Sequence, residues 1–246
     1  MLAYSHFLTD AKTCAYLRDR PSRLEVVLMS RITPREHEIL LDRGVRHFGR
    51  SYFRAACAGC RECVSVRVPV AKFQPSRSQR RVLAKNRDVE LEVGEPKVDD
   101  ERLDLHRRFH AERAQRRGWD ASEIDREEYI STFIENAVQV LEFRYRLAGR
   151  LIAIAYVDDC PGAYNSIFGF WDPAFPRRSL GTFDVLQEIA EASRRGKEHL
   201  YLGYHVRGCK SLEYKTSFRP HELLLDGKWV LRWKDEAPVP SAEESL

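Results

Sequence analysis

Three cysteines lie within seven residues of one another, in the segment Cys57-Ala-Gly-Cys60-Arg-Glu-Cys63. This spacing brings three thiolate donors into one loop, and a tetrahedral zinc site or a cubane iron–sulfur cluster needs a fourth ligand. Cys14 is the first candidate for that ligand and His47 the second. The spacing does not distinguish zinc from iron, and three free thiols in a loop of small residues are the alternative. Because all-sulfur ligation leaves no position open for water, we expect a structural or redox-sensing site.

The segment that contains these cysteines is strongly basic. Residues 46–87 carry eleven Lys and Arg and a single acid, Glu62, which gives +10 over 42 residues. Such a charge causes self-repulsion unless an anion is nearby, so we expect an anionic partner. Arg77, Arg80 and Arg81 recur near helical spacing, where they suit a phosphate backbone or a bidentate grip on a carboxylate. A solvated basic helix is the alternative.

Several familiar catalytic signatures are absent from the sequence. It has no G-x-x-x-x-G-K-[ST] phosphate loop, no G-x-S-x-G nucleophile elbow and no H-E-x-x-H zinc motif. Its eight histidines do not cluster as ligands along the chain, and Cys160 and Cys209 are isolated, as ordinary buried thiols would be. A hydrolase is therefore poorly supported, and no nucleotide cofactor is expected.

Length and composition limit the class of protein. The chain has 246 residues, 43% hydrophobic and 32% charged, with a formal net charge of +4. This composition supports a buried core in one large domain or two small ones. The apolar runs are too short for the ~20 residues of a membrane-spanning helix, and the N-terminus MLAYSHFLTD lacks the features of a secretory signal. We therefore expect a cytoplasmic protein with no membrane partner.

The first element expected to position these residues is a helix. The capping box Thr33-Pro34-Arg35-Glu36 marks its start, and Gly44 marks its end. Residues 45–54 and 64–70 are expected to be short strands on either side of the cysteine loop. Residues 76–86 are expected to form a basic helix, residues 89–93 a strand and residues 99–117 a longer helix.

The second half has the pattern of a mixed α/β fold. Strands are expected at 138–147, 151–157, 163–171 and 199–204, with a helix capped by Ser179 or Thr182, a short helix at 210–214 and a hairpin at 222–230 that turns at Asp226-Gly227. This order is compatible with an α/β (α+β) N-acetyltransferase-like core. We predict a basic N-terminal cysteine module over 1–95, a catalytic lobe over 96–234 and a flexible acidic tail over 235–246.

An ordered set of motifs resembles a known family. The run from Arg46 to Asn86 resembles the N-terminal region of bacterial aminoacyl-tRNA–protein transferases, which belong to the arginyltransferase family of the N-degron pathway. The resemblance continues in Phe170-Trp-Asp-Pro173, Ser179-Leu-Gly-Thr182, Tyr201-Leu-Gly-Tyr204, and Tyr214-Lys215 through Phe218-Arg-Pro220. These motifs cover most of the chain from about residue 10 to residue 230.

The resemblance implies that an aminoacyl group is transferred from tRNA to the α-amine of a protein beginning with Asp or Glu. The short bacterial branch uses leucyl-tRNA, marks its targets for degradation and has an N-acetyltransferase-like core. In relatives, cysteines at the positions of Cys14, Cys57, Cys60 and Cys63 bind an iron–sulfur cluster or zinc. This chain has Cys14-Ala-Tyr-Leu17 where relatives have Cys-x-x-Cys, so Cys14 stands alone there, and Leu212 replaces a frequent Met.

The chemistry of this reaction suggests roles for particular residues. An aminoacyl ester is already activated, and an α-amine with a pKa of about 8 is readily neutralised, so positioning matters more than a strong base. We predict that Arg77 and Arg80 or Arg81 hold the substrate carboxylate, with Lys215 or Arg219 as second choices. Tyr204 would donate to the ester or the leaving hydroxyl, and Asp172 would orient the amine.

The sequence is compatible with three other functions. Arginyl-tRNA could be the donor in place of leucyl-tRNA. A non-catalytic, metal-stabilised RNA-binding module would explain residues 46–87 alone. An acetyl-CoA-dependent acetyltransferase would need a Gly-rich pyrophosphate loop, which Pro176-Arg-Arg-Ser-Leu-Gly181 matches poorly.

Overall fold

The computed structural model describes residues 1–117 and 124–233, so the predicted acidic tail lies outside the described residues. The strands are β1 Leu2–Leu8, β2 Lys12–Thr13, β3 Pro21–Ser22, β4 Leu24–Arg31, β5 Arg46–Phe48, β6 Ser51–Ala55, β7 Val64–Pro69, β8 Val89–Gly94, β9 Val140–Leu147, β10 Arg150–Asp159, β11 Ala163–Trp171, β12 His199–His205, β13 His221–Leu225 and β14 Lys228–Arg232. The helices are α1 Pro34–Asp42, η1 Val70–Lys72, α2 Arg77–Lys85, α3 Asp100–Arg117, α4 Arg126–Tyr129, η2 Ile130–Ile134, η3 Pro176–Arg178, α5 Leu180–Arg194, α6 Lys210–Glu213 and η4 Tyr214–Ser217.

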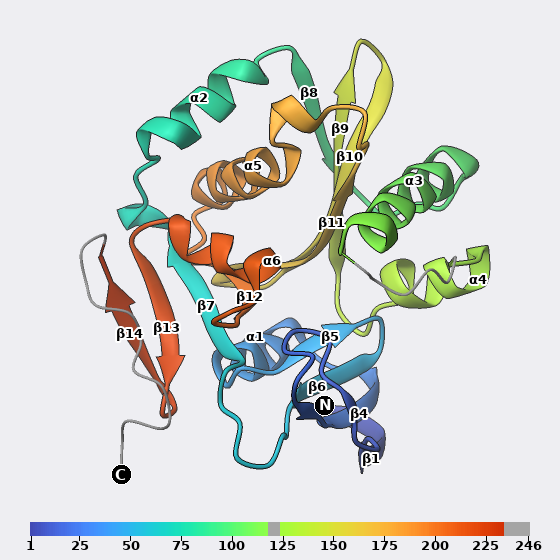
Figure 1. The fold of residues 1–246 in the computed structure, drawn as a ribbon, viewed down its shortest axis with the longest axis vertical. Coiled ribbons are helices and arrows are strands. Elements are labelled where there is room, and N and C mark those ends of the chain that lie inside the picture. Colours follow the sequence, from blue (N-terminus) through green and yellow to red (C-terminus); the bar gives the residue numbers. More distant parts are fainter. Residues whose placement is uncertain (118–123, 234–246) are drawn as a thin grey trace.

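A large sheet organises the molecule. Its strand order is β14-β13-β7-β12-β11-β10-β9-β8, and its only parallel pair within the described ranges is β11 with β12. Figure 1 shows α5 and α2 on one face of this sheet and α3 and α4 on the other. Each face has its own apolar core, one packed under α5 and the other under α3 and α4. The predicted mixed α/β class is confirmed.

A second sheet, of order β1-β4-β6-β5, packs with α1 at one end of the large sheet. The predicted capping box of α1 is confirmed, because Thr33 Oγ1 accepts from the Glu36 backbone while the Glu36 side chain accepts from the Thr33 backbone. The prediction of a single strand over 45–54 is wrong. A turn at Gly49 splits it into the β5–β6 hairpin, and Gly49 has φ +53°. A Cβ there would come within 2.1 Å of the Ser131 carbonyl oxygen, so only glycine fits.

Most of the other expected elements are present. The basic helix is α2, which has its own capping box between Ser76 and Gln79. The hairpin β13–β14 turns at Asp226 and Gly227, both with positive φ, as predicted. β7 and β8 come from the predicted N-terminal module but pair with strands of the later lobe, so the large sheet includes strands from both. The division of the chain into domains stays a prediction.

The longest helix that the structure describes is α3, with 18 residues, and it is strongly polar. None of the helices in the described ranges is apolar over a length that would cross a bilayer.

Candidate functional site

A cavity of about 1150 Å³ opens where β11 and β12 separate. The two strands pair only from Ala163 to Asn165, opposite His199 to Tyr201. On its other side, β11 has a bulge against β10, where Tyr156 pairs with Phe168 and the next residue, Val157, pairs with Ser166. A bulge bends and twists a strand locally, so the second half of β11 turns away from β12. This divergence provides the space for the cavity.

Five segments form most of the cavity walls. They are the loop after β2, the second half of β11 with the residues that follow it, one face of α3, the start of α5, and α6 with η4. Phe48 of β5 and Leu202 of β12 complete the lining. Aromatic rings form much of the lining: Tyr16, Phe48, Phe109, Phe168, Trp171, Phe175 and Tyr214. The charged lining residues are Arg18, Arg113, Arg116, Lys210 and Lys215 against Glu112 and Asp184. A large, partly aromatic and net positive cavity suits a substrate with both rings and negative charge.

The N-terminal end of α5 faces this cavity. Ser179 is its N-cap residue, as predicted, but it adopts a left-handed conformation with φ +54° and makes no side-chain cap bond. Gly181 in the first turn packs directly against Trp171, because a Cβ there would come within 2.6 Å of the ring. The positive end of the helix dipole therefore adjoins the cavity.

Lys215 is a cation held in the cavity wall. Its Nζ donates to the Tyr204 carbonyl at 3.0 Å, and burial together with the neighbouring charge of Arg46 lowers its pKa to about 7. Arg46 is itself buried, with its guanidinium over the rings of Tyr201 and Tyr204 at 5.7 and 5.6 Å. Within the described ranges, neither cation forms an ion pair with a carboxylate. Buried, unpaired cations are costly, so an anionic substrate group would stabilise this arrangement.

The structure separates the predicted carboxylate-binding residues. Of these five, Lys215 lines the cavity. Arg77, Arg80 and Arg81 are exposed on α2, away from the cavity lining, and Arg219 donates from Nε to the Thr216 carbonyl at 3.2 Å.

The two predicted catalytic residues are both buried and hydrogen-bonded within the protein. The Tyr204 hydroxyl donates to the Gly44 carbonyl at 3.0 Å. Asp172 accepts from the Ala174 backbone at 2.9 Å and pairs with Arg150 and with Arg108. Neither residue is in the cavity lining. Their catalytic roles stay predictions.

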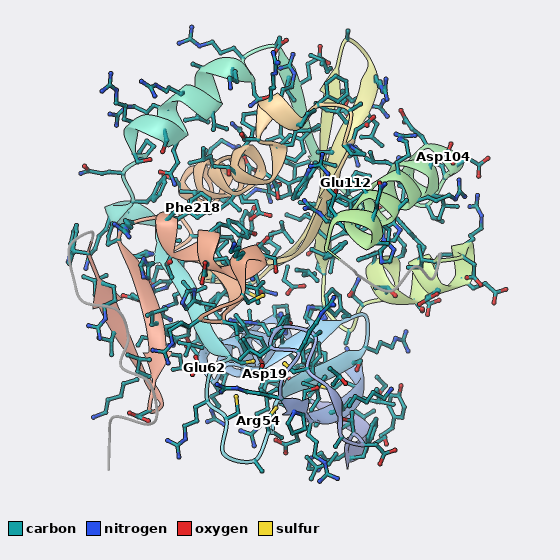
Figure 2. All side chains as sticks on the ribbon, in the orientation of Figure 1. Asp19, Arg54, Glu62, Asp104, Glu112 and Phe218 are labelled. Atoms are coloured by element: carbon teal, nitrogen blue, oxygen red, sulfur yellow. The ribbon has the colours of Figure 1, made fainter. Side chains whose placement is uncertain are left out.

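The four predicted ligand cysteines come from two loops of the N-terminal region. Figure 2 shows sulfur atoms between the labelled Asp19, Glu62 and Arg54. Burial, followed by the charges of Cys14, Cys57 and Cys60, raises the pKa of Cys63 to about 12, so the thiols lie within electrostatic reach of one another. All six cysteines are free thiols, and Cys160 and Cys209 are buried, as predicted.

Backbone groups already contact two of these sulfurs. Leu17 N–H donates to Cys14 Sγ at 3.5 Å, and Arg23 N–H donates to Cys57 Sγ at 3.4 Å. Such bonds stabilise thiolate ligands, so the donor set fits a thiophilic metal. Among the residues described, however, no three thiol sulfurs lie within 4.8 Å of one another. A tetrahedral zinc ion places its sulfurs about 3.8 Å apart, so a single ion would require the loops to draw together.

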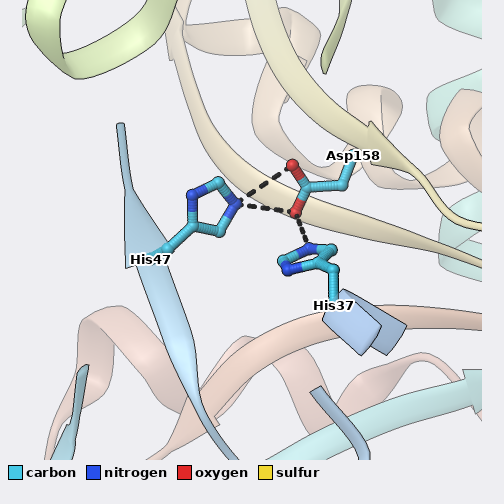
Figure 3. A group of neighbouring side chains, drawn as sticks. All are labelled: His37, His47 and Asp158. Carbon is cyan, nitrogen blue, oxygen red and sulfur yellow. Dashed lines mark hydrogen bonds and ion pairs between the residues drawn. The ribbon is translucent and has the colours of Figure 1, made fainter. Parts of the chain in front are cut away.

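The sequence predicts no cluster of histidine ligands, but two of the eight histidines meet at one acid. His37 from α1 and His47 from β5 both bind Asp158 of β10, as Figure 3 shows, with N···O distances of 2.9 to 3.0 Å. His47 also donates from Nδ1 to the Gly49 carbonyl at 3.0 Å. Both of its partners are acceptors only, so both ring nitrogens carry protons and His47 is an imidazolium. The cluster is therefore a buried ion pair that joins the N-terminal sheet to the large sheet.

Two acidic residues on α5 were not anticipated. Asp184 lines the cavity, and Glu188, one turn further along, is fully buried behind it. The sequence offered a signal, because both acids lie at i and i+4 on the otherwise apolar face of Leu180-Gly-Thr-Phe-Asp-Val-Leu-Gln-Glu-Ile189.

Comparison with known proteins identifies the family of the chain. The family model described as "Arginine-tRNA-protein transferase, C terminus" matches residues 101–225, and its N-terminal counterpart matches residues 12–81. The chain belongs to the arginine-tRNA–protein transferase family, which confirms the resemblance drawn from the motifs.

Curated relatives carry a more particular name, "Aspartate/glutamate leucyltransferase". The protein from Pseudomonas putida (strain W619) is 34% identical over 231 residues, which cover 91% of this chain and 95% of the relative. The one from Pseudomonas fluorescens (strain SBW25) is 35% identical over 228 residues, with the same coverage.

Solved structures with some similarity include FemX, with a TM-score of 0.47 and 9% identity over 84% of this chain and 81% of that one. Another is the C-terminal domain of a putative lysylphosphatidylglycerol synthetase from Agrobacterium fabrum, with a TM-score of 0.47 and 15% identity over 70% and 58%.

Proposed function

We propose that this enzyme transfers leucine from leucyl-tRNA to the N-terminal α-amine of proteins that begin with Asp or Glu, and so marks them for degradation. Its family and the names of relatives that align with most of the chain support this function. The structural observation that carries it is the cavity between β11 and β12, with the unpaired cation Lys215 in its wall. The separation of the two strands also suits an N-acetyltransferase-like core.

The acidic side chain of the acceptor protein would bind at Lys215. This residue was the second choice from the sequence, and it becomes the first because it lines the cavity while the arginines of α2 do not. Arg46 reinforces the positive charge from behind, since a Cβ on Gly203 would lie 3.3 Å from Lys215 Nζ and 4.0 Å from Arg46 Nε. A carboxylate arriving there would pair with a desolvated cation, which is a strong interaction.

The arginines of α2 would then bind the tRNA. Arg77, Arg80 and Arg81 are exposed, so their guanidinium groups are accessible to phosphates. Phosphate contacts of this kind supply affinity without reading sequence.

Cys14, Cys57, Cys60 and Cys63 would hold zinc or an iron–sulfur cluster. A metal of this type would keep the thiols deprotonated and fix the two loops against each other. Anaerobic purification, metal analysis and the absorption spectrum distinguish the two. A Cys63→Ser variant should lose the metal, whereas Cys160→Ser should retain it.

The function is tested with purified, metal-analysed enzyme, leucyl-tRNA or arginyl-tRNA, and peptides that begin with Asp, Glu or Ala. We expect a mass increase of one leucyl residue on the Asp and Glu peptides and none on the Ala peptide. Transfer from arginyl-tRNA instead would reassign the donor. Transfer from neither would refute the proposed function.

A further inference from the structure

The buried carboxyl group of Asp184 has a free oxygen at the cavity. The residue is 7% exposed and lines the cavity beside β11. Its Oδ1 accepts from the Tyr145 hydroxyl at 2.7 Å, whereas Oδ2 accepts no hydrogen bond from any residue that the structure describes. Gly169 leaves room for Oδ2, because a Cβ there would come within 3.0 Å of it. Tyr145 thus fixes the carboxyl group and leaves the other oxygen available to a ligand.

Glu188 lies behind Asp184 on the same helix. It is fully buried, it accepts from the Ser166 hydroxyl at 3.0 Å, and its Oε2 has no partner. Burial and the charge of Asp184 raise the pKa of Glu188 well above its ordinary value. Of the two acids, Asp184 is the one that reaches the cavity.

Among the described residues, the groups that interact with Asp184 are Tyr145 from β9, Tyr214 from η4 and Glu188 from α5 itself. The cations Arg113 and Lys215 line the same cavity. Burial raises the pKa of Asp184 to about 7, and the hydrogen bond from Tyr145 opposes this rise. A proton acceptor works best when its pKa is near the working pH, because it is then ionised and still basic.

We propose that Asp184 takes the proton from the acceptor protein's α-amine as this amine attacks the aminoacyl ester. The inference rests on the proposed function. The bound α-ammonium first releases one proton to water, which its pKa of about 8 makes easy. The neutral amine nitrogen then forms a bond to the ester carbonyl carbon, and one of its remaining protons passes to Asp184 Oδ2. The bond from that carbon to the ribose oxygen then breaks, and the proton goes from Asp184 to this oxygen, which restores the carboxylate.

The same placement explains how one cavity recognises an acidic N-terminus. Such a residue carries a positive α-amine and a negative side chain a few bonds apart. Asp184 and Lys215 both line the cavity and have opposite charges. An acceptor bound with its amine at Asp184 and its carboxylate at Lys215 has both charges paired.

The experiment measures kcat for leucine transfer to a saturating Asp-initiated peptide between pH 5.5 and 9. In the wild type, kcat should fall below about pH 7, because a protonated Asp184 cannot accept the proton. Asp184→Asn should lower kcat at pH 7 by about 100-fold or more, and its remaining activity should follow only the neutral amine, rising toward pH 8 and above. Binding of leucyl-tRNA should not change.

Two further variants keep the test decisive even if Asp184→Asn folds poorly. Tyr145→Phe removes a hydrogen bond that lowers the pKa of Asp184. The fall of kcat on the acid side of the pH profile, the acid limb, should therefore move to higher pH. Glu188→Gln is the matched control. It changes the neighbouring acid that lies outside the cavity lining, keeps the shape of the side chain and its bond from Ser166, and should keep most of the activity.

If the wild type is active but Asp184→Asn matches it in rate and pH profile, or if Tyr145→Phe leaves the limb in place, Asp184 is not the proton acceptor. If the wild type itself transfers nothing, the proposed function fails and this inference fails with it.

Discussion

Replacing Asp158 by Asn tests the buried ion pair that joins the two sheets. The substitution keeps the shape of the side chain but removes the charge that pairs with His47 and accepts from His37. It also affects Asn165, whose Nδ2 donates to Asp158 at 2.7 Å. All of these groups are buried, so water cannot replace the lost bonds.

The expected loss follows from this burial. Removing one member of a buried pair costs about 3–5 kcal/mol, because the remaining charge stays desolvated without a partner. Burial alone would lower the pKa of His47, but the charge and hydrogen bonds of Asp158 raise it above its ordinary value. Burial would raise the pKa of Asp158, but His47 and His37 hold it below its ordinary range.

Because the pKa values of His47 and Asp158 shift in opposite directions, the loss of stability is largest within a defined pH range. The contribution of His47 is complete below about pH 6.5 and is lost as the pH rises through its folded pKa. The contribution of Asp158 is complete above about pH 4 and is lost as the pH falls through its folded pKa. The variant should therefore be least stable, relative to the wild type, between about pH 4 and 6.5.

Urea unfolding followed by circular dichroism at several pH values measures this difference. Asp159→Asn is the matched control, because the neighbouring Asp159 is less buried and pairs with Lys197 near the surface. It should cost no more than about 1 kcal/mol. An Asp158→Asn variant as stable as this control, or one with a pH-independent deficit, would refute the buried ion pair.

The remaining predictions concern substrate binding. Lys215→Met should raise KM for Asp and Glu peptides by about 10- to 100-fold, the value of a charge-assisted hydrogen bond, while Lys72→Met, at an exposed lysine outside the cavity lining, should change it little. An unchanged KM would show that the acidic side chain binds elsewhere. Because the pKa of Lys215 is about 7, kcat/KM of the wild type for acidic peptides should also fall as the charge is lost above that pH. Replacing Arg77, Arg80 and Arg81 by Ala should weaken tRNA binding and reduce the slope of log K against log salt by about 2–3, measured by filter binding. Arg35→Ala, an exposed arginine on α1, is its control, and equal slopes for both proteins would contradict phosphate contacts by α2.

Local signals in the sequence identified the helix starts and the tight turn. The capping boxes at Thr33 and Ser76 and the turn at Asp226-Gly227 depend on neighbouring residues alone, so spacing was enough to find them. The turn at Gly49 was missed because its reason is distant: the backbone of Ser131 approaches it from another segment.

The site was harder to predict, because distant segments build it. His37 and His47 contact Asp158 although 121 and 111 residues separate them in the sequence. No local sequence pattern reveals a contact at such a separation. The motif at Tyr214-Lys215 identified a cavity residue, whereas the charge of α2 suggested a role in the cavity for arginines that lie outside it. The sequence did not single out Asp184 and Glu188, because acids on the apolar face of a helix indicate a functional site only once that face is known to be buried.

The separation of β11 from β12 gives the large sheet an edge inside the molecule. After Asn165, the backbone of β11 has no β12 partner on the side that faces the cavity, and Ser166, Ile167, Phe168 and Gly169 line its wall. Peptide N–H and C=O groups are too costly to leave unpaired, so water or a ligand must satisfy them. A peptide that enters in an extended conformation could bind these main-chain groups whatever its sequence. The cavity would then select the first residue of the peptide by its charges and bind the following residues through their backbone alone.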